Sequence, residues 1–297
     1  LGGITATINT VNAIDTNFFS LFTAVGSTES ISLIAIISLM AWGLGYFGQP
    51  HIIVRFMALR SVKDMPTARR IGMSWMIIAL IGALTTGLFG MAYANANNIN
   101  VDDPETIFIV LSQLLFHPLI AGFLLAAILA AIMSTISSQL LVTSSSLVND
   151  IYEVLFRKNA PQQELVLASR LAVLIVAIVA ILLALGENKS ILSLVSNAWA
   201  GFGAAFGPLI VLSLYRQDIS KIAALAGILA WTVTILIWMN IPYGDGQTLS
   251  AWMFELVPGF IISTVFILLF TRLYPNQAPE VAKHFSAMHQ QLDETRS

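Results

Sequence analysis

The feature that most limits what this chain can fold into is a long stretch without ionised side chains. From Thr106 to Asn149 the sequence contains no Asp, Glu, Lys or Arg. Charged residues make up 10% of the whole chain, whereas a soluble chain carries about 25%. Hydrophobic residues make up 57%. These values indicate a membrane protein, and the absence of Cys excludes a disulfide framework or a thiolate metal site.

Charge-free runs define the expected membrane spans. A spanning helix needs about 20 mostly apolar residues. The Thr106–Asn149 stretch would reach about 66 Å as one helix, which is too long for one span. His117-Pro118 divides it, and we expect a short surface helix over Pro104–Phe116 before the division. The seven expected spans are Ile31–Val54, Ile71–Ala94, Leu119–Val148, Leu165–Leu185, Ile191–Leu214, Ile222–Ile241 and Trp252–Thr271.

Basic residues lie in alternate loops of this seven-span arrangement. Every Lys and Arg except Lys189 falls on the side that also holds the C-terminus. Because loops rich in Lys and Arg stay in the cytoplasm, we expect a cytoplasmic C-terminus. The expected organisation is an extracytoplasmic segment over 1–28, a transmembrane core over 29–274 and a cytoplasmic tail over 275–297.

Hydroxyl side chains gather on one face of the third expected span. Ala131, Ser134, Thr135 and Ser138 follow the i, i+3, i+4, i+7 spacing of a single helix face. One interpretation is structural, because small residues allow close helix packing and hydroxyls bond to their own helix. The other is a site for Na⁺, a hard cation that binds uncharged oxygen atoms and backbone carbonyls. The span contains no Asp or Glu, which argues against Ca²⁺.

The first expected span contains an aromatic segment that is prone to break, "AWGLGYFGQPHII". Trp42 and Tyr46 are helical i, i+4 partners, and Pro50 follows after four more residues. Pro50 lacks a backbone donor and clashes with the carbonyl of residue 46, while the glycines ease unwinding. Irregular backbone at membrane depth is tolerated where protein or a watery cavity covers it. A simple proline kink with aromatic packing is the alternative interpretation.

The fifth expected span carries a second glycine-rich segment, "AWAGFGAAFGP". Gly201, Gly203, Gly207 and Pro208 predict a hinge or a thin gate. Close packing between helices through small residues is the alternative.

The segments Ser38–Ser61 and Gly122–Leu147 resemble the sodium/solute symporter family, within it the bacterial sodium/proline symporters. The resemblance implies an all-α membrane protein, of which this chain is the C-terminal part of a five-plus-five inverted-repeat (LeuT-like) transporter. It implies import of L-proline coupled to Na⁺ in the bacterial plasma (inner) membrane, with no other cofactor and no nucleic-acid partner. The residues that it assigns are Ala131, Ser134 and Thr135 for Na⁺, and Trp42, Tyr46 and Pro50 for the solute.

Other functions remain open at this point. The solute could be another small amino acid or an organic acid, and related membrane domains also form the input part of sensor kinases. An enzyme is not expected, since the serines lack a His or Lys that could activate them. Because family members carry further N-terminal helices with additional sodium ligands, residues 1–297 alone are expected neither to bind sodium tightly nor to transport.

Overall fold

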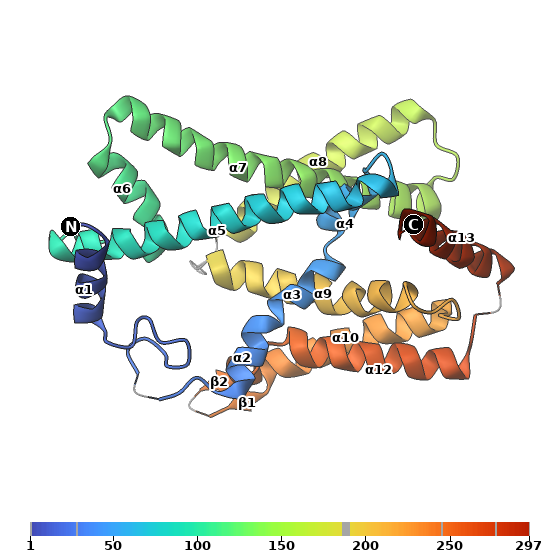
Figure 1. Cartoon of the computed structure of the whole chain (residues 1–297). Coiled ribbons are helices and arrows are strands. Elements are labelled where there is room, and N and C mark those ends of the chain that lie inside the picture. Colours follow the sequence, from blue (N-terminus) through green and yellow to red (C-terminus); the bar gives the residue numbers. More distant parts are fainter. Residues whose placement is uncertain (1, 28, 186–190, 245, 277, 297) are drawn as a thin grey trace. The chain divides into compact units, whose positions relative to one another are not determined.

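The structure is a computed structural model that describes residues 2–27, 29–185, 191–244, 246–276 and 278–296. Within these ranges it is almost entirely helical, as expected for an all-α membrane protein (Figure 1). Contacts between residues divide it into two compact units, Leu1–Ile31 with Asp64–Gln139 and Ser32–Lys63 with Leu140–Ser297. Lys189, the one basic residue expected outside the cytoplasmic loops, lies outside the described residues.

The first unit is organised around one long helix, α5. Its elements are α1 (Ile4–Ile14), α5 (Met65–Ala96), the 3₁₀ turn η3 (Pro104–Thr106), α6 (Ile107–Leu115) and most of α7 (Pro118–Ser145). Both α1 and α6 pack against α5, and α1 buries Thr7 and Val11. The short helix expected before His117-Pro118 is confirmed, since η3 and α6 together cover Pro104–Leu115.

The second unit contains the broken helix and the helices that hold it. Its first elements are α2 (Leu33–Met40), α3 (Trp42–Gly45), the 3₁₀ turn η1 (Tyr46–Gly48), α4 (Pro50–Met57), and the π-helix η4 (Ser146–Phe156). The helices α8 (Gln162–Ala184), α9 (Ile191–Ser213), α10 (Lys221–Asn240), α11 (Leu249–Trp252), α12 (Leu256–Leu273) and α13 (Pro279–Arg296) follow. Strands β1 (Pro242–Tyr243) and β2 (Gln247–Thr248) form an antiparallel hairpin between α10 and α11. The 3₁₀ turn η2 (Val62–Asp64) leads into α5.

Six helices in the described residues are long and apolar enough to cross a membrane. A seventh span results if Leu33–Gly48 and Pro50–Met57, which are bent by 54° at their junction, are counted as one. Seven spans were expected, with somewhat different ends, because several helices continue beyond the charge-free run. The six unbroken spans are Val62–Ala96, Pro118–Phe156, Gln162–Ala184, Leu194–Ser213, Lys221–Asn240 and Leu256–Leu273.

The break in the first span falls where the sequence predicts it. Gln49 has extended backbone angles (φ −86°, ψ 110°), and Pro50 is the first residue of α4. A proline is favoured at that position, because its missing N–H would have no partner there in any case. The chain therefore changes direction between Gly48 and Pro50.

Close approach of backbones holds the broken helix against α9. A Cβ atom built on Gly48 would lie 2.1 Å from the carbonyl oxygen of Phe202, and one on Gly203 would lie 2.7 Å from the Cα of Gly45. Around this contact Ala41, Ala200, Ala204 and Leu256 form a buried cluster. Small residues are thus what allows α3 and η1 to lie directly on α9. α9 is one helix through this region, with Pro208 inside it.

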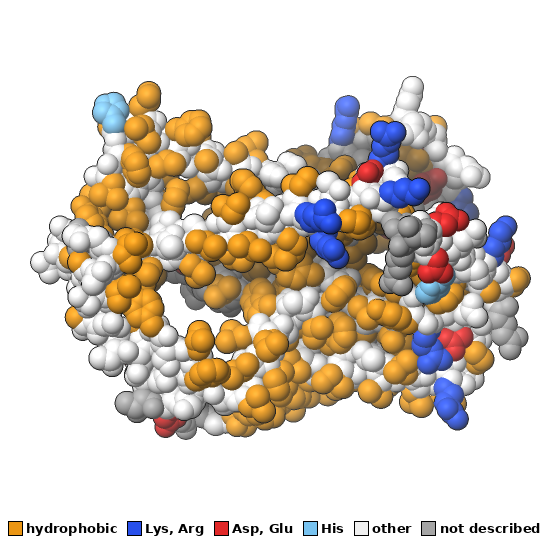
Figure 2. Space-filling view, viewed as in Figure 1, with side chains coloured by type: hydrophobic (Ala, Val, Ile, Leu, Met, Phe, Trp, Pro, Cys, Tyr) orange, Lys and Arg blue, Asp and Glu red, His pale blue; other side chains and the backbone are white. Residues whose placement is uncertain are grey.

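Charged side chains of the second unit gather at one end. Figure 2 shows hydrophobic side chains along α9, α10 and α12 and charged ones at the end where α13 lies. Arg216, Lys221 and Arg272 flank the spans at this end. The long hydrophobic lengths between the charged ends match the requirement for crossing lipid.

Two glycines of α9 make a matched pair for testing this packing. Gly203→Ala should sharply lower the amount of folded protein in the membrane, because the new methyl group meets the backbone of Gly45. Gly201→Ala should leave the amount unchanged, since its Cβ would find only Trp231 at 3.8 Å, an ordinary contact. Quantitative immunoblots of membrane fractions measure both. Equal abundance of the two variants would contradict the packing account.

Candidate solute site at a broken helix

Aromatic rings surround the break and set the environment of the two expected solute residues. Trp42 stacks on Trp199 (centroids 6.1 Å apart, planes at 29°) and on Phe254 (5.6 Å, 15°). Tyr46 meets the same Trp199 edge-on, at 4.8 Å and 85°. Trp42 is half-buried within this cluster, whereas Tyr46 is 50% exposed. Tyr46 therefore offers the more accessible ring.

Hydrogen bonds to α9 lie on both sides of Tyr46. The N–H of Tyr46, the residue that ends α3, donates to the carbonyl of Leu44. The indole Nε1–H of Trp199 donates to the Trp42 carbonyl, at 2.9 Å. The Gln49 amide donates in turn to the carbonyl of Trp199, at 3.2 Å. The broken span is therefore bonded to α9 through a backbone carbonyl before Tyr46 and a side-chain amide after it.

A third bond fastens the other end of the broken helix. The backbone N–H of Phe254, in the turn between α11 and α12, donates to the hydroxyl of Ser38 at 3.1 Å. Ser38 lies on α2, one turn before Trp42. The α11–α12 turn and α9 thus hold α2, α3 and η1 from two sides. Pro50 begins α4 on the far side of the break and belongs to none of these bonds.

The expected sodium residues lie in the first unit, on α7. Ala131, Ser134 and Thr135 belong to one regular helix, and both hydroxyl residues are exposed. The Thr135 hydroxyl lies 3.4 Å from the Ala131 carbonyl, a long contact for a hydroxyl bond, and Ser138 donates to the Thr135 carbonyl at 2.8 Å. No partner is found for the Ser134 hydroxyl among the described residues. The hydroxyls of Ser134 and Thr135 are therefore only weakly engaged by their own helix.

Carboxylates do not assemble into a metal site in the part of the chain that the structure describes. No group of three or more His, Cys, Asp or Glu side chains lies close enough there to hold an ion.

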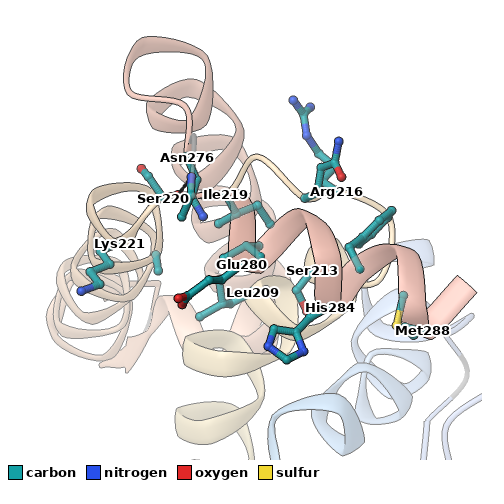
Figure 3. Close-up of a pocket in the computed structure, with 15 residues that line it drawn as sticks. Leu209, Ser213, Arg216, Ile219, Ser220, Lys221, Asn276, Glu280, His284 and Met288 are labelled. Carbon is teal, nitrogen blue, oxygen red and sulfur yellow. Dashed lines mark hydrogen bonds between the residues drawn. The ribbon is translucent and has the colours of Figure 1, made fainter.

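A cavity of about 710 Å³ lies away from the break (Figure 3). It opens between the end of α9, the start of α10 and the tail helix α13, where Leu209 and Ser213 lie across from Glu280 and His284. None of the expected solute or sodium residues lines it.

The turn beside this cavity is held by an ion pair. The Arg216 side chain donates to Asp218 at 2.8 Å, and this bond holds the pKa of the Asp218 carboxyl below its ordinary value. The Asp218 carbonyl also accepts from the N–H of Asn276, at 2.8 Å. The α9–α10 turn and the end of α12 are therefore joined, and the cavity has a defined wall.

Several residues at the break were missed from the sequence. Trp199 stands inside the quoted glycine-rich segment, where only the glycines and Pro208 were considered, and Phe254 lies in an expected span. Gln49 carried a signal, because a polar amide stands between glycine and proline in an apolar run. Gln49 is 4% exposed and its amide donates to the Trp199 carbonyl, which identifies it as part of the site's framework.

Glu255 was also missed, although it falls inside the seventh expected span. It immediately precedes α12 and is only 4% exposed. Burial raises the pKa of its carboxyl above the ordinary value. The residue is an acid in an apolar setting directly after Phe254, one of the rings around the break.

Comparison of the sequence with known proteins identifies the family to which the chain belongs. The model of the sodium:solute symporter family matches residues 1–230. The chain belongs to this family. The high-affinity proline transporter PutP of Bacillus subtilis is 52% identical over 93% of the chain, and the osmoregulated proline transporter OpuE of the same organism is 48% identical over 98%. The sodium/proline symporter 2 of Staphylococcus saprophyticus is 54% identical over 82%.

These family members are longer than the chain. The matches cover 56%, 57% and 49% of the three relatives, so the chain spans about half their length. All three are named as transporters or symporters, and the family is one of solute carriers rather than enzymes. No solved structure was found to match the chain. With its apolar helices, this family member is a multi-pass membrane protein.

Burial of Glu255 makes stability depend on pH. A carboxyl whose pKa is raised by folding contributes stability below the pKa of an unfolded glutamate, about 4.3, and loses it as pH rises through the folded value. Glu255→Gln should therefore unfold at a higher temperature than the parent near neutral pH, with the difference vanishing towards about pH 4. Thermal unfolding in detergent measures this effect.

The exposed Glu280 supplies the control for this experiment. Glu280→Gln should change the unfolding temperature little at either pH. A Glu255→Gln variant that is destabilised at neutral pH would show that the carboxylate form is needed.

Proposed function

We propose that this chain is part of a sodium-coupled symporter that imports L-proline across the bacterial plasma membrane. Its family and the proline specificity in its relatives' names support this function. The observation that carries the proposal is the span that breaks at Gln49-Pro50 and leaves Tyr46 half exposed beside Trp42. A broken helix at membrane depth is where transporters of this kind hold solute and ions.

The proposed architecture is the second half of a five-plus-five inverted repeat. The broken span over 33–57 would be the first helix of the second repeat, α5 the second and α7 the third. This order is supported by the bend of 54° in the first of these spans and by the continuous helices of the other two.

The proposed orientation places α13 in the cytoplasm. Basic residues flank the spans of the second unit at the end that carries α13, whereas the buried acid Glu255 lies at the opposite end of α12. Positively charged loops remain cytoplasmic. Proline and sodium would therefore enter from the side of the α11–α12 turn.

The solute would be bound by an aromatic surface and by polar backbone. The pyrrolidine ring of proline would pack on Tyr46 and on the part of Trp42 left free by its neighbours, while its carboxylate and ammonium groups would take backbone or hydroxyl partners. Pro50 would keep the backbone at this place from closing into a regular helix.

The coupling ion would use the hydroxyl face of α7. Ser134 and Thr135, with the carbonyl of Ala131, would supply neutral oxygen atoms to Na⁺, and the long Thr135 contact leaves that hydroxyl available. An ion stabilises only the state for which it has the higher affinity. Sodium bound from outside would favour the outward-open state, and Gly201, Gly203, Gly207 and Pro208 of α9 would form the gate.

Sodium dependence tests the assignment of α7. In a complete symporter that contains residues 1–297, Thr135→Ala should raise the sodium concentration for half-maximal uptake about tenfold, the effect of one lost polar contact. The proline concentration for half-maximal uptake at saturating sodium should change much less.

Two variants serve as controls for that experiment. Thr135→Ser keeps the hydroxyl and should restore most of the sodium affinity. Thr86→Ala removes a hydroxyl that bonds to its own helix on α5, at 2.8 Å from the Gly82 carbonyl, and should have no effect. Equal loss of sodium and proline affinity in Thr135→Ala would contradict the assignment.

Proline affinity tests the aromatic surface. Tyr46→Ala and Trp42→Ala should each raise the proline concentration for half-maximal uptake at least about tenfold, because a buried aromatic contact is lost. Radiolabelled uptake with competing amino and organic acids measures both affinity and specificity. An unchanged proline half-saturation in either variant would show that the solute contacts other residues. Stronger competition by another solute would show that this solute, rather than proline, is the preferred substrate.

A further inference from the structure

We propose that Trp199 is a positioning residue of the solute site, acting together with Gln49. This inference rests on the proposed function, because it concerns how the aromatic surface is held for its solute. Trp199 would not need to touch the solute. Its indole would fix Trp42 and Tyr46 in the arrangement that binds it.

Reciprocal hydrogen bonds join Trp199 to the broken helix on both sides of Tyr46. The indole of Trp199 donates to the carbonyl of Trp42, four residues before Tyr46, and the carbonyl of Trp199 accepts from Gln49, three residues after it. The N–H of Gln49 also donates to the Tyr46 carbonyl, at 3.4 Å. Trp199 of α9 is therefore bonded to the chain both before and after the irregular turn, and it fixes the separation of the two ends of that turn.

The same indole sets the direction of the Tyr46 ring. Tyr46 meets Trp199 edge-on at 4.8 Å, a favoured arrangement of aromatic pairs. Gly45 makes this approach possible, because a Cβ there would lie 2.0 Å from the indole Nε1. The rings of Trp42 and Tyr46 thus share one neighbour, which is fixed by two hydrogen bonds.

The packing beneath Trp199 does not depend on the indole N–H. The buried cluster of Ala41, Ala200, Ala204 and Leu256 lies against the rings through apolar contacts. Replacing Trp199 with Phe keeps an aromatic ring but removes the donor to Trp42. The Trp42 carbonyl would lose the hydrogen bond from α9, and the turn that carries Tyr46 would no longer be held in one geometry.

Trp199→Phe in a complete symporter that contains residues 1–297 tests this role. The proline concentration for half-maximal uptake should rise about five- to tenfold, the effect of one lost hydrogen bond on the arrangement of the site. The maximal rate per transporter molecule should stay within about twofold, because the bond concerns binding rather than later steps. Initial uptake rates, divided by the amount of transporter in the membrane, give both quantities.

Trp238→Phe is the matched control. Trp238 also donates its indole N–H to a backbone carbonyl in the same unit, that of Met253 at 3.0 Å, and its ring packs near Trp252. Its bond lies in the α11–α12 turn, one residue before Phe254, and does not reach the backbone around Tyr46. The same chemical change at Trp238 should therefore raise the half-saturation for proline much less than the change at Trp199.

Gln49→Met provides a second, independent variant. Methionine preserves the length of the side chain but cannot donate to the Trp199 carbonyl. It should raise the half-saturation in the same direction, and the double variant Gln49→Met/Trp199→Phe should lose less affinity than the product of the two single effects. Such non-additivity is expected when two residues act through one shared structure.

Three results of the uptake assay would overturn the proposal. They are an unchanged proline half-saturation in Trp199→Phe at normal abundance, an equal rise in Trp238→Phe, and fully multiplicative effects of the two site variants. Loss of both site variants from the membrane would also overturn it, since the role would then be in folding alone. The parent symporter is assayed in parallel. Absence of sodium-dependent proline uptake by the parent would refute the proposed function. The proline half-saturation of each variant relative to the parent tests the role of Trp199.

Discussion

A polar backbone inside a bilayer needs protein partners, and this requirement organises the second unit. At Gln49-Pro50 the regular helical path of the first span stops. An indole from α9 donates to the carbonyl of Trp42 on this span, and the Gln49 side chain donates back to α9. Because an unpaired polar group costs several kcal/mol in lipid, these bonds help to keep the broken span at membrane depth. The glycines at 45, 48 and 203 follow from the short approach that these bonds demand.

Much of the fold could be predicted because lipid imposes simple rules. Runs without charge locate the spans, and Pro50 with its neighbouring glycines locates the break, since both effects act within a few residues of sequence. The helical period likewise places Ser134 and Thr135 on one face of α7. Ends of helices were less certain: η4 carries the third span on to Phe156 as a π-helix, beyond the apolar run that defines it in sequence.

The partners at the break could not be predicted, because they come from distant parts of the chain. Trp199 is 157 residues from the carbonyl that it binds, and the Ser38 bond to Phe254 joins residues 216 apart. Hydropathy also gives no sign that Glu255 is buried, since an acid near the end of a span faces water in most helices. Helical spacing finds the residues on one face of an element, but the tertiary fold decides what that face meets.

The stacked rings around Trp42 have a spectroscopic consequence. Indole emission is sensitive to the polarity around the ring and to hydrogen bonding of its N–H, and neighbouring aromatic rings exchange excitation energy. Trp199 is in contact with both Trp42 and Tyr46, and it is bonded through its N–H. The intrinsic fluorescence of the chain therefore contains a reporter at the break, one that needs no attached dye.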